Sequence, residues 1–222
     1  MVHDGHRGRL KQRFLEHGLD SFDDHNALEL LLFYAVPRRD TNELAHRLID
    51  SFGSLDRVLD ARPEELMAVP GVGEGIVTLL RLVPAIEKRA AIERASMTDV
   101  LPDVRSVGAY LIPRFRDSRT ENVLVLCLDT KYKVLDCRPV GRGGITSAEF
   151  SMREVAQIAL QRNASFVVLA HNHTSGIALP SAEDKDVTKK VQEILGYVGV
   201  RLIDHIIVAG DDFISLADDG LL

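Results

Sequence analysis

The sequence has no tryptophan and only two cysteines, Cys127 and Cys137, among its 222 residues. Two cysteines cannot form the disulfide framework of a small secreted domain, which favours a reducing compartment. No secretory h-region follows Met1, and no apolar run approaches the roughly 18 residues that a membrane helix needs. We therefore expect a cytoplasmic protein with no membrane partner.

The chain also lacks a surplus of basic residues, since its formal net charge is −6 and neither half is basic. A strong nucleic-acid binder would carry such a surplus, so the overall charge does not favour DNA as a partner. With 45% apolar and 27% charged residues, the composition is that of a folded globular protein and excludes a wholly disordered chain. The length allows one large domain or two small ones, and the oligomeric state is left open.

The first 97 residues contain no β-like alternation and have helical spacing throughout. Thr41 is placed as a helix N-cap, Gly53 lies just past a helix end, and Pro63 stands in a first turn. The pattern predicts helices over residues 7–17, 24–36, 41–52, 63–69 and 76–95, with a short turn at 55–59.

A change of pattern at residues 96–104 predicts a linker, and strands alternate with helices after it. Helices are expected at 106–115, 151–163 and 181–198, and strands at 121–128, 133–138, 166–170, 202–208 and 213–216. The sequence therefore predicts a helical domain over residues 1–97 and a mixed α and β domain around a central sheet over 98–222.

Residues 66–73 (LMAVPGVG), followed by a helix, are typical of a helix-hairpin-helix. The glycines permit a tight turn that exposes backbone N–H groups, where a phosphate can bind. Glu64, Glu65 and Glu74 stand nearby and would repel phosphate. DNA binding through residues 63–80 and a helical module that packs or binds a partner protein are both compatible with this pattern.

His171 and His173 lie two residues apart at the exit of a predicted buried strand. A period of two places both imidazoles on one face, and histidine is the commonest metal ligand. Asp184, just inside the next helix, is a candidate third ligand for a zinc site that keeps one position open. Ser181-x-x-Asp184 is also typical of a helix cap, and a capped helix start is a rigid place to hold a ligand.

These residues resemble a known motif. The spacing His171-x-His173, seven residues, Ser181-x-x-Asp184 is similar to the JAMM (MPN+) metalloprotease motif, which also has a glutamate at the start of an earlier strand, where Glu121 stands. Nearly the whole chain resembles the bacterial RadC family. The stretches that carry this resemblance are 5–10 (GHRGRL), 28–35 (LELLLFYA), 69–73 (VPGVG), 169–173 (LAHNH) and 202–208 (LIDHIIV).

The resemblance implies a three-layer JAMM/MPN domain, similar to cytidine deaminases, behind the helical region. It further implies a zinc-dependent hydrolase, in particular a metallopeptidase or isopeptidase with a protein or peptide substrate. His171, His173 and Asp184 would bind Zn²⁺ together with a water molecule. Glu121 would act as the general base, and Ser181 would donate a hydrogen bond to the oxyanion.

This chain departs from the family beside the expected site. Thr174 stands where proline is usual, and residues 176–181 read GIALPS where the family usually has GDPTPS. The ligands are intact, so the difference concerns the shape of the substrate pocket.

Three alternatives remain at this point. The protein could be a DNA-associated module, as the family's historical link to repair suggests, with a structural or vestigial metal. Nuclease activity is the second, although phosphodiester enzymes often use two metals and ligands for only one are found. Asp204 and His205 could form a satisfied buried pair, or support a metal from behind.

Overall fold

The computed structural model describes residues 3–37, 39–97, 99–146 and 150–222. The chain divides into two compact units, Met1–Glu87 and Lys88–Leu222. The division falls within a long helix, α6, whose end precedes the predicted boundary between residues 97 and 98. Each unit is described separately below.

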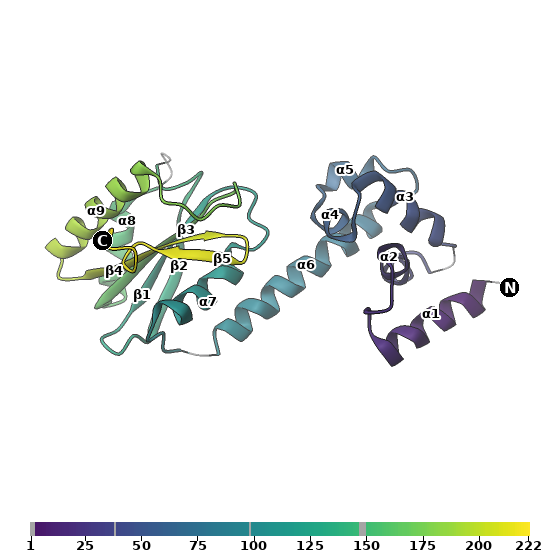
Figure 1. Cartoon of the computed structure of the whole chain (residues 1–222), viewed down its shortest axis with the longest axis horizontal. Coiled ribbons are helices and arrows are strands. Elements are labelled where there is room, and N and C mark those ends of the chain that lie inside the picture. The colour runs from purple at the N-terminus through teal and green to yellow at the C-terminus, as the bar shows by residue number, and fades with distance from the viewer. Residues whose placement is uncertain (1–2, 38, 98, 147–149) are drawn as a thin grey trace. The chain divides into compact units, whose positions relative to one another are not determined.

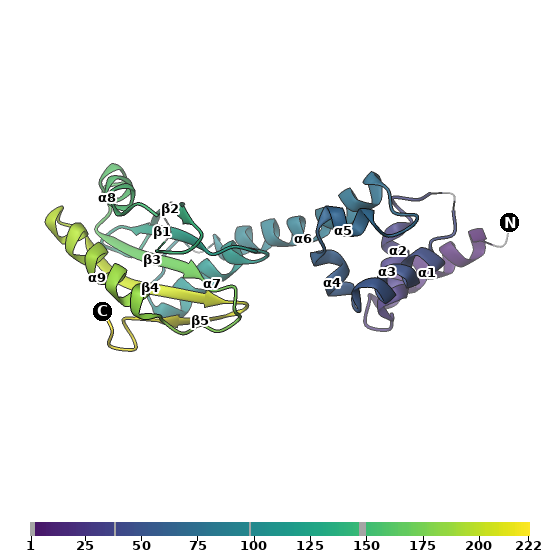
Figure 2. The same ribbon diagram turned by 90° about the horizontal axis from the view of Figure 1, so that it is seen from above.

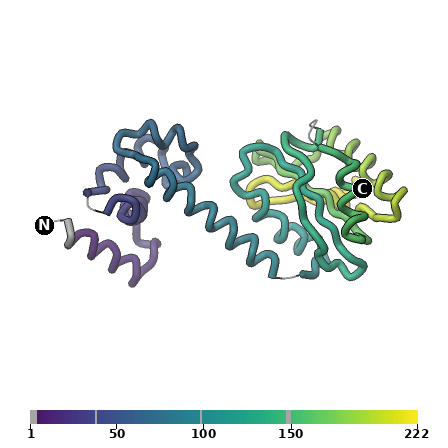
Figure 3. The backbone as a smooth tube through the Cα atoms, turned by 180° about the vertical axis from the view of Figure 1, so that it is seen from behind, coloured from purple at the N-terminus to yellow at the C-terminus, as the bar shows by residue number. Residues whose placement is uncertain are grey.

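The first unit is helical, as expected, and its backbone is the purple-to-blue trace of Figure 3. Leucines recurring at helical spacing, among them Leu28, Leu32, Leu48 and Leu66, form its buried core. Its helices are α1 (His3–His17), α2 (Asp24–Leu32), α3 (Asn42–Phe52), α4 (Leu55–Asp60), α5 (Pro63–Met67) and the first part of α6 (Glu74–Ala95).

Several helix ends in this unit differ from the sequence prediction, and the turn predicted at 55–59 is the short helix α4. Helix α2 ends at Leu32, before the predicted end at Val36, and a turn carries the chain toward Pro37. Thr41 is the N-cap residue of α3, but its hydroxyl makes no cap hydrogen bond and donates to the Glu29 carbonyl, 3.5 Å away. Gly53 ends α3 with φ +93°, as a residue past a helix end often does.

The predicted hairpin is formed by α5, a tight turn and the start of α6. The Val72 N–H donates to the Val69 carbonyl, and Gly71 between them has φ +95°, a conformation that favours glycine. Glu74 begins α6, and Arg62 pairs with Glu65 at 2.9 Å beside α5. The hairpin therefore exists, with acidic groups on both of its helices.

The second unit contains a five-stranded sheet of order β2-β1-β3-β4-β5, drawn in Figure 1. Strands β3 and β4 are parallel, and the other neighbouring pairs are antiparallel. Its elements are α7 (Val104–Phe115), β1 (Asn122–Leu128), β2 (Val134–Arg142), α8 (Met152–Gln161), β3 (Phe166–Asn172), α9 (Ala182–Tyr197), β4 (Arg201–Ala209) and β5 (Asp212–Ser215).

Helices cover both faces of this sheet, which gives the three layers seen in Figures 1 and 2. Alternating residues of β1 and β3, such as Leu126 and Val168, pack against α7 on one face. Val125 and Leu169 point to the opposite face, where α8 and α9 lie. The expected fold, a helical region followed by a mixed α and β sheet domain, is confirmed.

The two cysteines lie on paired strands but on opposite faces of the sheet. Cys127 belongs to the core beneath α8 and α9, whereas Cys137 packs toward α7. Both thiols are free, and burial raises the pKa of Cys127 to about 12 and that of Cys137 to about 11. They are packed thiols and not a disulfide, because side chains on opposite faces of the sheet cannot bridge.

Among the described residues, we find no helix with the length and apolar character that crossing a bilayer requires.

Candidate metal centre

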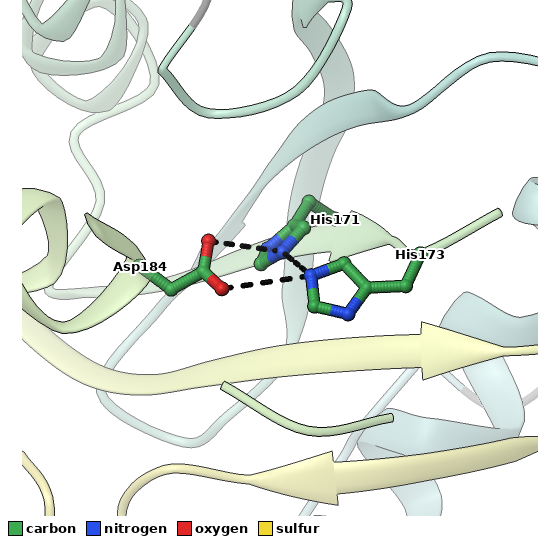
Figure 4. Close-up of side chains that lie close together, drawn as sticks. All are labelled: His171, His173 and Asp184. Atoms are coloured by element: carbon green, nitrogen blue, oxygen red, sulfur yellow. Dashed lines mark hydrogen bonds and ion pairs between the residues drawn. The ribbon is translucent and has the colours of Figure 1, made fainter. Parts of the chain in front are cut away.

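The central strand β3 and helix α9 bring together His171, His173 and Asp184, as Figure 4 shows. His171 is the penultimate residue of β3 and is paired with Val123 of β1, and His173 immediately follows the end of the strand. Because side chains alternate between the two faces of a strand, residues two apart share a face, and both rings point to the face that α9 covers. Asp184 in the first turn of α9 faces them, so residues separated in sequence form one cluster.

The three side chains converge at bonding distances. His171 Nε2 is 2.9 Å from His173 Nε2 and 3.3 Å from Asp184 Oδ1, and His173 Nε2 is 3.5 Å from Asp184 Oδ2. Ligand atoms about 2.1 Å from a tetrahedral ion lie about 3.4 Å from one another. The observed distances are close to this spacing, and two imidazole nitrogens with a carboxylate form a donor set that suits zinc. The residues present therefore fit a divalent metal ion.

The cluster is prepared for a cation by burial and hydrogen bonding. His171 and Asp184 are buried, and His173 is partly buried. The Nδ1–H of His173 donates to the Ile177 carbonyl at 3.2 Å, because a carbonyl can only accept. Its Nε2 therefore carries a lone pair when the ring is neutral, and this lone pair faces the other two ligands.

The protonation states agree with a ligand role. Burial, with a smaller effect from His173, lowers the pKa of His171 to about 4 against the attraction of Asp184. Burial acts to raise the pKa of the Asp184 carboxyl. The hydrogen bonds from Ser181 and the electrostatic attraction of His171 and His173 outweigh it, so this pKa lies below its usual value. At neutral pH the site presents a neutral imidazole and a carboxylate, the forms that bind metals.

Ser181 holds the Asp184 carboxylate in place. Its hydroxyl donates to Asp184 Oδ2 at 2.6 Å, its backbone N–H donates to the same oxygen at 2.8 Å, and the Asp184 N–H donates to the hydroxyl oxygen at 3.0 Å. The predicted cap of α9 is thus a reciprocal capping box. The hydroxyl proton is engaged with the ligand, and its role toward an oxyanion stays a prediction.

Glu121 immediately precedes β1, and the β1–β3 register brings it next to the cluster. Val123 is paired with His171, so continuing the antiparallel register by two residues places Glu121 opposite His173, on the face that α9 covers. The Asn172 side chain accepts from the Asn122 N–H at 2.7 Å and donates to the Thr120 carbonyl at 3.2 Å. The residues on both sides of Glu121 are therefore bound to the strand that carries the histidines.

The glycine-rich segment after β2 also holds Glu121. The N–H groups of Gly143 and Gly144 donate to the Glu121 carbonyl at 2.7 and 3.3 Å. Residues 141 and 142 lie within β2, and residues 147–149 lie outside the described part of the chain. The segment therefore lies beside the candidate base and is bonded to its backbone.

Two buried residues lie beneath the cluster: His205, for which the sequence left a supporting role open, and Thr188, which was not predicted. His205 Nε2 is 2.8 Å from His171 Nδ1, and His205 Nδ1 is 2.6 Å from the Thr188 hydroxyl. Asp204 and His205 are both buried, and Asp204 accepts hydrogen bonds from the Ser215 hydroxyl at 2.6 Å and from the His205 N–H at 2.7 Å. This agrees with the expectation of a satisfied buried pair. Thr188 left no signal of its own, except that it lies one helical turn after Asp184.

The atypical loop between the ligands is exposed. Ile177 and Leu179 are 59% and 68% accessible, although both are apolar, and the Ile177 carbonyl is the acceptor for His173. The segment that departs from the family pattern is thus bonded directly to a candidate ligand.

Known proteins match this chain over both units. A family model described as the RadC-like JAB domain matches residues 101–221. A UPF0758 protein of Ruegeria pomeroyi is 36% identical over 217 residues, covering 98% of this chain and 97% of the relative. UPF0758 proteins of Bordetella petrii and Rhodobacter capsulatus are 35% and 36% identical, covering 96% of this chain and 95% and 100% of the relatives. The sheet unit has the fold of this domain around a cluster that can bind a metal, and the chain belongs to the RadC family.

Proposed function

We propose that this protein is a zinc-dependent hydrolase that cleaves peptide or isopeptide bonds in the cytoplasm. The observation that carries the proposal is the convergence of His171, His173 and Asp184 at 2.9–3.5 Å. Glu121 lies two residues before Val123, the strand partner of His171. A domain kept only for binding has no need of a candidate base beside an intact ligand set.

In this proposal His171, His173 and Asp184 hold Zn²⁺. The ion supplies Lewis acidity, which lowers the pKa of water and polarises a carbonyl group. Glu121 accepts a proton from the attacking water at its carboxylate and passes it to the leaving amine. In the substrate-free site the Ser181 hydroxyl donates to Asp184 Oδ2. On substrate binding this proton turns to the developing oxyanion, while the Ser181 N–H keeps its hydrogen bond to Asp184.

Metal content is the first experiment. Untagged protein, purified without a chelator, is analysed by mass spectrometry beside the His171→Ala/His173→Ala double variant. We expect about one zinc per chain in the wild type and loss of it in the variant. No metal in either protein, even after zinc is added back, would rule out the hydrolase.

A zinc-loaded protein then enters a peptide and isopeptide substrate screen. The Glu121→Gln variant, which keeps all three candidate ligands, is the inactive control. Cleavage by the wild type alone supports the proposed reaction, whereas equal cleavage by both proteins would assign the activity to a contaminant.

The α5–α6 hairpin supports a second candidate function, DNA association through residues 63–80. The tight turn at Gly71 is the observation in its favour, and the acidic groups Glu64, Glu65 and Glu74 oppose it. Fluorescence anisotropy with branched and single-stranded DNA at increasing salt decides this question. Affinity that falls steeply with salt supports DNA binding. Binding no stronger than that of an unrelated acidic protein excludes it.

A further inference from the structure

A chain of buried hydrogen bonds connects the back of His171 to the backbone of Asp184. It runs from His171 Nδ1 to His205 Nε2 at 2.8 Å, from His205 Nδ1 to the Thr188 hydroxyl at 2.6 Å, and from that hydroxyl to the Asp184 carbonyl at 2.5 Å. His171, His205 and Thr188 are each at most 1% exposed. Two candidate ligands are thus joined through β4 and α9, away from the side that faces the metal.

The direction of every bond in this chain follows from its last acceptor. A backbone carbonyl cannot donate, so the Thr188 hydroxyl gives its only proton to the Asp184 carbonyl. The hydroxyl must then accept from His205, which requires a proton on His205 Nδ1. The two nitrogens of the fully buried His205 face a hydroxyl and another imidazole, and burial outweighs the attraction of the nearby Asp184 carboxylate. His205 is therefore neutral, and its Nε2 is an acceptor.

The position of the proton on the candidate ligand His171 follows from that of His205. Because His205 Nε2 accepts, His171 Nδ1 must carry the proton and donate. The reverse arrangement would leave the Thr188 and Asp184 oxygens 2.5 Å apart with no proton between them, which is repulsive. In the observed arrangement the Nε2 of a neutral His171 is left with a free lone pair, directed at His173 and Asp184.

We infer that Thr188 and His205 are positioning residues that fix His171 in its Nδ1–H tautomer, so that Nε2 is ready to bind a metal ion. This inference rests on the proposed function for its purpose, but the tautomer itself is a property of the metal-free protein. Hydrogen-bond partners behind a ligating histidine commonly change metal affinity 10- to 100-fold. The Thr188 hydroxyl, although it lies two side chains behind His171 Nε2, should have an effect in this range.

The first test reads the tautomers directly. Metal-free protein with ¹⁵N-labelled histidine is studied by long-range ¹H–¹⁵N correlation at neutral pH, and His171→Ala and His205→Gln variants assign the signals. We expect Nδ1 protonated and Nε2 bare in both His171 and His205. A proton on Nε2 of either ring would overturn the inference, and the wild-type spectrum decides this even where a variant fails to fold.

The second test separates this role from a merely structural one. Zinc affinity is measured by competition with a chromophoric chelator for Thr188→Val, which removes the hydroxyl, and Thr188→Ser, which keeps it. We expect a 10- to 100-fold weaker affinity for the first and nearly wild-type affinity for the second. Thr41→Val, at another buried threonine in the helical unit, is the matched control for losing a buried hydroxyl and should bind zinc normally.

The outcomes distinguish the two proposals. Wild-type zinc affinity in a folded Thr188→Val protein would overturn the inference. If the wild type binds no zinc while both rings show Nδ1–H, the proposed hydrolase is wrong and the tautomer assignment holds.

Discussion

The carboxylate of Glu121 lies against Gly144, where any larger residue would carry its Cβ. A Cβ built on Gly144 collides with Glu121 Oε2, and Gly144 has φ +88°, which also favours glycine. Gly144 is buried and its N–H donates to the Glu121 carbonyl at 3.3 Å. Because Gly144 has no side chain, the Glu121 carboxylate can occupy its observed position.

Gly144→Ala should displace the Glu121 carboxylate while leaving His171, His173 and Asp184 intact. We expect zinc content to stay near one per chain and hydrolysis of the screened peptide to fall by at least tenfold, because the base loses its position. Backbone strain adds a destabilisation of about 1 kcal/mol or more. Metal analysis, turnover and urea unfolding measure the three effects.

Gly199→Ala is the matched control for that strain. Gly199 has φ +73°, and its added Cβ would meet nothing within 4 Å. It should lower the free energy of unfolding without changing turnover. Equal turnover losses in both variants would show that strain alone, and not contact with Glu121, causes the effect.

Glu121→Gln should remove the general base and keep the shape of the side chain. We expect turnover to fall about 10²- to 10⁴-fold with zinc affinity largely retained. Glu183→Gln, at an exposed carboxylate beside Asp184 in α9, is the control and should keep nearly full turnover. Loss of zinc in Glu121→Gln would instead make Glu121 a ligand, which the proposal does not allow.

Ser181→Ala should weaken both helix α9 and the metal site. It removes the N-cap hydroxyl, which costs about 1 kcal/mol, and the 2.6 Å hydrogen bond to Asp184 Oδ2. We expect zinc affinity to fall about tenfold in a chelator competition. Ser151→Ala removes the corresponding cap of α8, where the hydroxyl accepts from the Glu154 N–H at 3.3 Å. That variant should lose comparable stability with unchanged zinc affinity.

Cys127 and Cys137 should be unreactive in the native protein. Burial raises their pKa values to about 12 and 11, so almost no thiolate exists at pH 8. We expect alkylation by iodoacetamide to be slow until urea unfolds the chain, when both thiols react. The raised pKa values also mean that the folded state holds these protons more tightly than the unfolded state. Their stabilising effect is therefore complete below about pH 8 and is lost as the pH rises from about 9 through 11 to 12. Rapid reaction of the folded protein would contradict this burial.

Local patterns in the sequence were enough to locate most elements and the ligand set. Helical spacing identified the first unit, and the short apolar run ending at Ala170 identified the central strand. Element ends were less well predicted: β3 extends to Asn172 and α2 stops at Leu32. These ends depend on neighbouring strands and on turn hydrogen bonds, which residue patterns do not encode.

The candidate site combines both kinds of information. Spacing alone suggested that His171 and His173 share a face and that Ser181 caps the helix of Asp184, since both are properties of one strand or one helix turn. Glu121 required the resemblance to a family motif, because a glutamate before a strand is by itself an ordinary surface residue. The Asn172 clamp that binds the residues beside Glu121 became visible only in the folded chain.

The sequence by itself thus determined the helical and mixed units, the identity of the three candidate ligands and the capping box that supports one of them. Only the tertiary structure decided that Gly144 makes room for Glu121 and that Thr188 and His205 stand behind His171. The physical reason is that the first group depends on residues close in the chain, whose relative positions are set by helix and strand geometry. The second group depends on contacts between strands and a helix that are adjacent only after the sheet and its covering helices have packed.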